Sequence, residues 1–255
     1  ELALNDGVCL LTGKQMGART GTLMDYKTYE DVERAFAAQI DYFFERMIRC
    51  CEVVEKAHAE LLPSPFLSSV VRDCLEKGVD VTAGGAHYNL SGIQAIQCAN
   101  VADSLAALKT LVYGENIIGR EALLKALRRN FKGDELMRLR LINKALKYGN
   151  DIAWVDEIAY RWVRDFSERL SRYTNVRGGP YHAGLYTVSA HVPMGKNVGA
   201  MPDGRMAQEP LADGGMSAMY GRDVSGPTAV LKSVAMVDSS LGSNGTLLNM
   251  KFLPS

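Results

Sequence analysis

Residues 191–215, HVPMGKNVGAMPDGRMAQEPLADGG, are rich in Gly, Pro, Asp and Asn and contain few long apolar side chains. Neither a helix nor a regular strand favours this composition, because Gly weakens both and Pro removes a backbone donor. Such a stretch is typical of an irregular path in which Asp and Asn side chains satisfy local backbone groups. The fold must therefore accommodate a long Gly-rich connection after residue 190.

The first two-thirds of the chain carries helical periodicity instead. Thr28 lies three residues before Asp31, a capping-box spacing, and apolar residues then recur at helical spacing as far as Val54. We predict a long amphipathic helix over 28–60 that ends at the segment LLPSPF. Similar patterns predict a helix over 65–77, ended by Gly78, and helices over 100–113, 120–131, 134–146, 151–174 and 226–238.

Short strands are expected at three places where β-branched or apolar residues adjoin Gly-rich turns. They lie at the start of residues 79–97, over 184–192 and over 245–253. Two or three strands cannot form a satisfactory sheet alone. The sequence therefore predicts a mixed α/β protein, helix-rich in its first two-thirds, with strands and Gly-rich loops later.

The charge balance limits the kinds of partner. Lys plus Arg and Asp plus Glu number 29 each, so the formal net charge is zero, which argues against nucleic acid or an anionic membrane as the main partner. No apolar run approaches the roughly 20 residues that a membrane span needs. The five cysteines, at 9, 50, 51, 74 and 98, form an odd set without C-x-x-C spacing. They indicate reduced thiols and a cytoplasmic protein.

Local patterns that invite a catalytic interpretation each have a simpler one. GVCLLTGK has the wrong glycine spacing for a phosphate loop and lacks Ser or Thr after Lys14, so it predicts an ordinary turn. The adjacent Cys50 and Cys51 fall on or beside the apolar stripe of the long helix, which favours core positions over redox chemistry.

The four histidines lack zinc-ligand spacing, so a catalytic metal is not expected. His58 is expected to face solvent near a helix end. His87, His182 and His191 lie beside Gly-rich strand ends, where functional groups collect, and any of them is a candidate for ligand contact.

Several Gly-rich motifs recur in a consistent order along the whole chain. GGAHYNLSGIQAIQCANVADSLAALK, KYGND, SAHVPMGKNVGAMPDGRMAQEPLADGG, GRDVSGPTAVLKSVAMVD and NGTLLNMKF together resemble the glycyl radical enzymes, the pyruvate formate-lyase-like group. The resemblance implies part of a ten-stranded α/β barrel wrapped by helices, in which two finger loops meet at the centre. It implies that residues 1–205 belong to the barrel domain and that residues 206–255 begin a truncated glycyl radical domain.

The motifs that carry the radical chemistry of this family do not occur in the sequence. The thiyl cysteine of the family lies in a Gly-Cys-x-Glu-Pro loop and the radical glycine in an Arg-Val-x-Gly-Tyr-like stretch, and no cysteine here has the Glu-Pro context. We therefore expect an internal fragment, with the cysteine loop before Glu1 and the glycine loop beyond Ser255. No catalytic residue is assigned, and the isolated chain is expected to be inactive.

By resemblance, the segments SGIQAIQ and LYTVSAHVP are where barrel residues approach the substrate. This implies a pocket wall that includes Ile93, Ile96, Tyr186, Val188 and His191, although a core position is an equal alternative for each aliphatic residue, and the family often has Asn where His191 stands. For Asp203, Gly204 and Arg205 we favour a structural role in the loop over direct catalysis.

The resemblance is strongest to the dehydratase and lyase branch, which acts on glycerol, propanediol, choline or hydroxyproline. It implies that the parent protein cleaves C–O, C–N or C–C bonds of a small substrate as a homodimer in an anaerobic cytoplasm. A protein glycyl radical, installed by a radical-SAM activating enzyme, would be its cofactor, and the chain itself would hold none. The alternative hypothesis is a non-catalytic α/β module that binds a small ligand or a partner through its Gly-rich strand ends.

Overall fold

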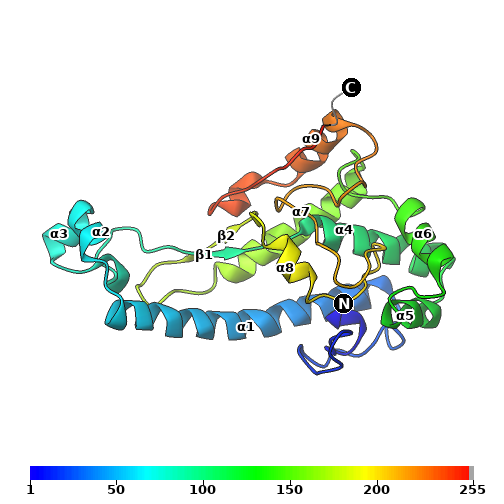
Figure 1. Cartoon of the computed structure of the whole chain (residues 1–255), viewed down its shortest axis with the longest axis horizontal. Helices are drawn as coiled ribbons and strands as arrows, with labels where there is room; N and C mark the ends of the chain where they lie inside the picture. Colours follow the sequence, from blue (N-terminus) through cyan, green and yellow to red (C-terminus); the bar gives the residue numbers. More distant parts are fainter. Residues whose placement is uncertain (253–255) are drawn as a thin grey trace.

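The polypeptide is organised around one long helix and a short parallel sheet (Figure 1). The computed structural model describes residues 1–252. The helices are α1 (Tyr29–Leu61), α2 (Pro65–Val70), α3 (Arg72–Lys77), α4 (Cys98–Ala107), α5 (Arg120–Arg128), α6 (Glu135–Asn143), α7 (Ala153–Leu170), α8 (His191–Gly195) and α9 (Pro227–Met236). The strands are β1 (Ser91–Gln94) and β2 (Tyr181–Gly184), and short 3-10 turns lie at Leu2–Leu4, Val81–Ala83 and Ser239–Gly242.

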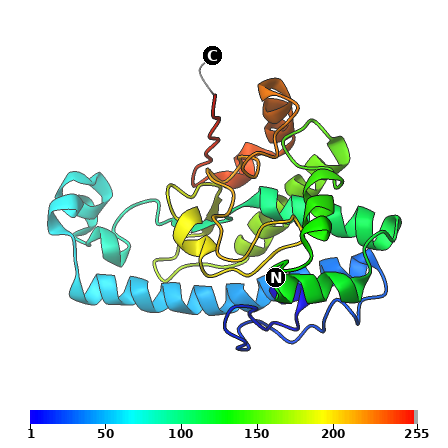
Figure 2. The ribbon, with the colours of Figure 1, turned by 45° about the vertical axis from the view of Figure 1, so that its right-hand side comes forward.

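Helix α1 begins at the predicted capping box. The Thr28 side chain accepts a hydrogen bond from the Asp31 backbone at 3.3 Å, and the Asp31 carboxylate accepts one from the Thr28 backbone at 2.8 Å. The helix ends at Leu61, shortly before Pro63, because proline cannot continue it. Figures 1 and 2 show α2 and α3 at the far end of α1, away from the other helices. The long helix expected from the sequence is confirmed.

The sheet packs one of its faces against α1 and α7. The strands are parallel, with Ser91 opposite Tyr181 and Gln94 opposite Gly184. Tyr181 and Ala183 of β2 form a buried cluster with Phe44 and Ile48 of α1 and Leu170 of α7. Because a two-stranded sheet is only marginally stable in water, this apolar support is needed to hold the strands in place.

A larger core lies around α4, which packs against α7. Ala99, Ala102 and Ala106 are completely buried on α4, and their small side chains allow the two helix backbones to approach closely. The chain continues from α4 into a π-helical turn over Leu108–Gly114. The helices expected over 100–113, 120–131, 134–146, 151–174 and 226–238 are present, with bounds that differ by several residues at some ends.

The helix expected over 65–77 is divided in two. Val71 has an extended backbone (φ −98°, ψ 112°) between α2 and α3, which interrupts the helical hydrogen-bond pattern. Gly78 ends α3 in the left-handed conformation (φ 63°), as predicted.

Two of the expected strands are wrong in position, and the reasons are local. The start of residues 79–97 forms a 3-10 turn, because the Asp80 carboxylate accepts hydrogen bonds from the backbone and hydroxyl of Thr82 at 2.9 and 2.6 Å. The strand expected over 184–192 lies instead over Tyr181–Gly184. Val188 then adopts a positive φ of 50°, and α8 begins at His191, so the chain leaves the sheet early.

The strand expected over 245–253 is also absent as a regular element among the described residues. Residues 245–252 run without helix or strand, and a single parallel bridge joins Thr246 to Leu185. Residue 253 lies outside the described residues. In the described part of the chain, no helix combines the length and the apolar character that crossing a membrane requires.

Candidate functional site

The carboxyl ends of β1 and β2 lie side by side. Gln94 and Gly184 occupy the last paired position, and the Ala95 backbone continues the pairing by donating to the Gly184 carbonyl at 2.8 Å. In parallel sheets the loops that follow the strands converge at this edge, where ligand-binding groups collect. The ends of these two strands are therefore the candidate functional site.

A third stretch, close to the chain end, lies along the free side of β2. The Asn244 backbone donates to the Ala183 carbonyl at 3.0 Å, and the Leu185 backbone donates to the Gly245 carbonyl at 2.8 Å. The Leu247 backbone completes the contact with a 2.9 Å hydrogen bond to the Leu185 carbonyl. Residues 244–247 thus bring side chains from the last part of the sequence to the same site.

The two faces of the sheet differ in chemistry because side chains alternate along a strand. Ile93 lies on the face that packs against α1 and α7, with Tyr181 and Ala183. The opposite face carries Gly92 and Gln94 from β1 and, paired with them, His182 and Gly184 from β2. We call these four residues, together with Tyr186, Ser243 and Asn244, the polar face.

Two glycines make room for amide side chains on the polar face. A Cβ atom at Gly92 would lie 2.1 Å from the Asn244 side-chain nitrogen, and one at Gly184 would lie 2.2 Å from Oε1 of Gln94. Both distances are far shorter than any real contact, so the two amide side chains lie directly on the glycine backbones. Glycine at these positions therefore permits polar side chains to lie flat across the sheet.

Hydrogen bonds connect most of the polar side chains on this face. The His182 Nδ1 atom lies 2.6 Å from the Ser243 hydroxyl, and the Asn244 amide donates to the Tyr186 hydroxyl at 3.4 Å. By contrast, the Gln94 Oε1 atom is buried and has no hydrogen-bond partner among the described residues. An unpaired buried amide oxygen in a folded protein calls for an explanation such as a ligand.

The residues expected to form the pocket wall do not share one surface. Ile93 packs on the helix side of the sheet, whereas Tyr186 lies on the polar face. Ile96 is half-buried after β1, and Val188 is 73% exposed in a strained positive-φ turn after β2. His191 is the first residue of α8, with its Nδ1 atom 3.4 Å from the Thr187 hydroxyl.

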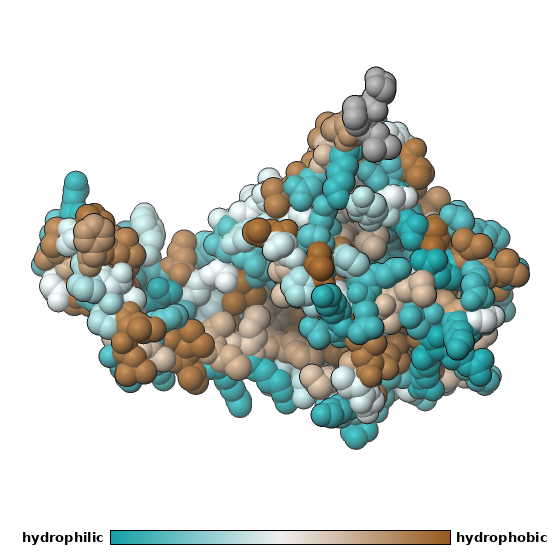
Figure 3. All heavy atoms as spheres, viewed as in Figure 1, coloured by the Kyte–Doolittle hydropathy of each residue, from teal (hydrophilic) through white to brown (hydrophobic). Residues whose placement is uncertain are grey.

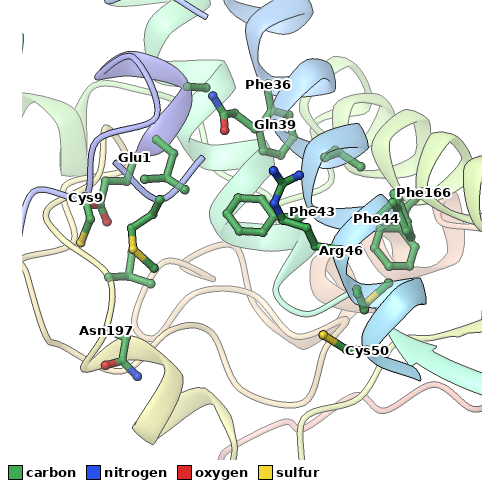
Figure 4. A pocket seen from close by; sticks show the side chains of 16 residues that line it. Glu1, Cys9, Phe36, Gln39, Phe43, Phe44, Arg46, Cys50, Phe166 and Asn197 are labelled. Atoms are coloured by element: carbon green, nitrogen blue, oxygen red, sulfur yellow. The ribbon is translucent and has the colours of Figure 1, made fainter. Parts of the chain in front are cut away.

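A wide apolar groove lies elsewhere in the described part of the chain. It is an open groove of about 680 Å³ between α1, the first residues of the chain and residues 197–198, visible in Figure 3 as a hollow between α1 and α8. Figure 4 shows Phe36, Phe43, Phe44 and Phe166 on its wall. The groove contains none of the expected pocket residues and few polar groups. It therefore offers apolar surface for packing rather than a set of converging groups for chemistry.

The Gly-rich segment 191–215 is held by one buried cation. Arg205 is 1% exposed and donates to the carbonyls of Gly195 at 2.7 Å, Gly199 at 2.8 Å and Glu209, the last through Nη2. Asp203, also 1% exposed, accepts from the Arg205 backbone at 2.9 Å. The guanidinium thus supplies hydrogen bonds that a helix or strand would otherwise provide.

Polar side chains of α4 form hydrogen bonds to the segment 191–215 and to the KYGND motif. The Asn100 amide donates to the Asp203 carboxylate at 2.7 Å and accepts from the Ala212 backbone at 2.8 Å. Asp103 is completely buried, and burial raises its pKa to about 7. Its carboxylate accepts a 2.8 Å hydrogen bond from the Tyr148 backbone. Residues of the KYGND and loop motifs are therefore joined to α4 through buried hydrogen bonds.

The cysteines separate into inert and accessible groups. Cys98 is buried and its thiol donates to the Gly215 carbonyl at 3.3 Å. Burial raises its pKa to about 12, which keeps the thiol neutral and unreactive. Cys51 is half-buried against the Phe44 cluster, but Cys50 is exposed and lines the groove. The expected core position is thus wrong for Cys50, which is exposed on the wall of the open groove.

The sequence interpretation included His182 and Tyr186 of the polar face but missed Gln94, Ser243 and Asn244. It singled out SGIQAIQ but chose the isoleucines, whereas the alternation Gly92, Gln94 places the glutamine on the open face. The signal was present in the sequence: a glycine and a polar residue two positions apart in a short strand indicate a face that is not packed. The contact with Asn244 could not be foreseen, since it spans about 150 residues of chain.

The family profile described as pyruvate formate lyase-like matches residues 1–195, and the profile described as glycine radical matches residues 212–255. A trans-4-hydroxy-L-proline dehydratase from Clostridioides difficile is 37% identical over 255 residues, which is 100% of this chain and 32% of that protein. A (2S)-3-sulfopropanediol dehydratase from Klebsiella oxytoca is 37% identical over 257 residues, covering 99% of this chain and 31% of its own length.

A solved structure gives the same result for the fold. The glycerol-bound B12-independent glycerol dehydratase from Clostridium butyricum superposes with a TM-score of 0.91 at 42% identity, covering 97% of this chain and 31% of that chain. The chain thus spans about a third of the length of the proteins that it matches. The expected fold, part of the α/β barrel of such enzymes, is confirmed over this length.

Proposed function

The chain belongs to the pyruvate formate lyase-like family of glycyl radical enzymes, and from this we propose that the protein containing it is a radical dehydratase of a small hydroxylated compound. The observation that carries the proposal is the match to dehydratases along the full length of the chain, at 37% identity in two curated relatives. The pyruvate formate lyase-like profile matches residues 1–195, and the glycine radical profile follows it at residues 212–255.

The relatives suggest the substrate class. Glycerol, sulfopropanediol and hydroxyproline, named for the three similar proteins, each carry a hydroxyl group on an aliphatic carbon. In a radical dehydration a hydrogen atom would first be abstracted from an unactivated C–H bond next to the carbon that bears the hydroxyl. The hydroxyl group would then leave with a proton as water, and the resulting product radical would take the hydrogen atom back. A protein radical supplies this abstraction when the whole enzyme is active, and substrate orientation selects the hydrogen.

The residues of this chain would provide one wall of the reaction chamber. The polar face presents hydrogen-bonding groups that can orient hydroxyls, and its glycines allow the Gln94 and Asn244 amides to lie against the sheet. Behind the sheet, the apolar cluster of α1, α7 and β2 excludes water from that side. In this arrangement Ile96, Tyr186, Val188 and His191 are proposed wall positions, whereas Ile93 supports the sheet from behind.

We infer that residues 1–205 form part of the barrel domain and residues 206–255 begin the glycyl radical domain, a division supported by the family matches at 1–195 and 212–255. We also infer a homodimer in an anaerobic cytoplasm, activated by a radical-SAM enzyme. Asp203, Gly204 and Arg205 shape the loop rather than react, which their buried hydrogen bonds support.

The test begins with the coding sequence on both sides of this segment, and continues with the full-length protein. After anaerobic activation by the radical-SAM enzyme, electron paramagnetic resonance should show a glycyl radical. The activated protein should convert glycerol, propane-1,2-diol or trans-4-hydroxy-L-proline to a dehydrated product. A full-length protein without cysteine and glycine loops, or one that forms no radical, would support the non-catalytic binding module instead.

A further inference from the structure

One side chain on the polar face stands out because its hydrogen-bonding capacity is unused. Oε1 of Gln94 is buried without a partner among the described residues. The nearby polar groups are engaged: His182 with Ser243 at 2.6 Å, and Tyr186 with Asn244 at 3.4 Å. Leaving a buried amide oxygen unpaired destabilises the folded state. Retention of such a group at the edge of a candidate site indicates that something binds it.

The position of Gln94 is fixed by the sheet rather than by a flexible loop. It is the last residue of β1 and pairs with Gly184 at the end of β2. All three atoms nearest to a Cβ built at Gly184 belong to the Gln94 side chain, at 2.2 to 2.8 Å. The missing side chain at Gly184 therefore creates the space in which the amide lies. A side chain placed by a strand end is well suited to orient a ligand.

We propose that Gln94 is a substrate-binding residue that hydrogen-bonds a hydroxyl group of the substrate from the polar face. The inference rests on the proposed dehydratase function, which supplies a hydroxylated substrate. A carboxamide presents both a donor and an acceptor, and a hydroxyl group can pair with either. A substrate hydroxyl would satisfy the unpaired oxygen on the face that also carries Tyr186, whose hydroxyl group already accepts from Asn244.

Gly184 provides the space that the Gln94 amide occupies. Because its φ is not positive, alanine is conformationally allowed there, and the added Cβ would meet only the end of a movable side chain among its nearest atoms. Gly184→Ala should therefore displace the Gln94 amide without breaking the sheet. Gly92→Ala is a matched control, since its Cβ would displace Asn244 on the same face and leave Gln94 in place.

The experiment compares full-length Gln94→Leu, Gly184→Ala, the double variant and Gly92→Ala with the parent protein. Radical content is measured by electron paramagnetic resonance, and kcat and KM are measured with glycerol and trans-4-hydroxy-L-proline. For Gln94→Leu and Gly184→Ala we expect a normal radical content and a KM raised about 10-fold or more for whichever compound is turned over. The double variant should equal Gln94→Leu, whereas any effect of Gly92→Ala should add to that of Gln94→Leu.

Binding of the same two compounds to the unactivated proteins, measured by calorimetry, makes the result independent of turnover. Equal affinities or an unchanged KM in Gln94→Leu, with a parent protein that is active, would overturn the role of Gln94 and leave the dehydratase proposal intact. A loss of radical content or of thermal stability in Gln94→Leu would also overturn it, because the amide would then hold another segment of the protein. If the parent forms no radical, the dehydratase proposal fails, and the binding comparison still decides whether Gln94 holds a hydroxylated ligand.

Discussion

At the scale of single residues, the Arg205 side chain supplies the hydrogen bonds that a regular helix or strand would otherwise provide to the backbone. The segment around it follows an irregular path, and its buried carbonyls at Gly195 and Gly199 point at the guanidinium rather than at a neighbouring strand. Arginine suits this role because its planar group offers five donors in fixed directions. The pKa of Arg205 is lowered by burial, but guanidinium groups stay protonated in proteins, so the donors remain available.

Replacing Arg205 with Met should destabilise the protein strongly. The substitution keeps much of the side-chain length but leaves several buried carbonyls without donors, and each costs about 1–3 kcal/mol. We expect the free energy of unfolding, measured by urea-induced unfolding, to fall by at least about 3 kcal/mol. Arg19→Met is the control: Arg19 is 75% exposed in a surface pair with Asp6, and its replacement should change stability by less than about 0.5 kcal/mol. Similar losses in both variants would contradict the role of Arg205.

Cysteine reactivity should follow burial. Burial raises the pKa of Cys98 to about 12, above the roughly 8.5 of an unfolded cysteine. The stability associated with its neutral form is therefore complete below about pH 8.5 and is lost as pH rises toward 12. At pH 8, iodoacetamide should label the exposed Cys50 and leave Cys98 intact until denaturant is added.

Peptide mass spectrometry checks this labelling pattern, and Cys98→Ala checks the pH dependence. The stability of the parent protein relative to this variant should decrease between pH 9 and pH 11, because only the parent has to keep the buried thiol protonated. Rapid labelling of Cys98 in the native protein at pH 8 would show that its surroundings are open to solvent.

At the scale of elements, the strands depend on the helices around them. Each strand has four residues, too few for independent stability. Helix α1 supplies Phe44 and Ile48 and α7 supplies Leu170 to the face behind the sheet. The stretch 244–247 then adds backbone hydrogen bonds along β2. The sheet is therefore a place where five segments of the chain meet, rather than a self-supporting unit.

At the scale of the whole molecule, a large amount of apolar surface is uncovered. Helix α1 beyond its midpoint and the α2–α3 hairpin carry highly exposed side chains, including Val53 at 68%, Leu61 at 75%, Phe66 at 85% and Val70 at 69%. The apolar groove beside α1 adds to this surface. Soluble monomers rarely expose contiguous apolar areas of this kind, and in a whole relative about two-thirds of the protein would be available to cover them.

The 255-residue chain expressed alone should therefore self-associate. We expect concentration-dependent aggregation by size-exclusion chromatography with light scattering, and strong binding of a hydrophobic dye, because exposed apolar faces attract one another. The full-length protein should show neither property. A sharp unfolding transition of the isolated chain that does not depend on concentration would indicate instead that these 255 residues are sufficient to form a stable domain.

The sequence by itself determined the helices, the family and the nature of the Gly-rich segment. Capping at Thr28, apolar periodicity and the helix ends before Pro63 and at Gly78 depend on residues within a few positions of one another, so they can be predicted locally. The tertiary structure alone decided which side chains meet: Gln94 on Gly184, Asn244 on Gly92, and Cys98 at the Gly215 carbonyl. These contacts join residues about 90 to 150 positions apart, and they depend on how the strands pair and which face the helices cover. The Gly92, Gln94 alternation indicates an unpacked face of one strand, but local sequence patterns do not specify which distant segments pair with that strand.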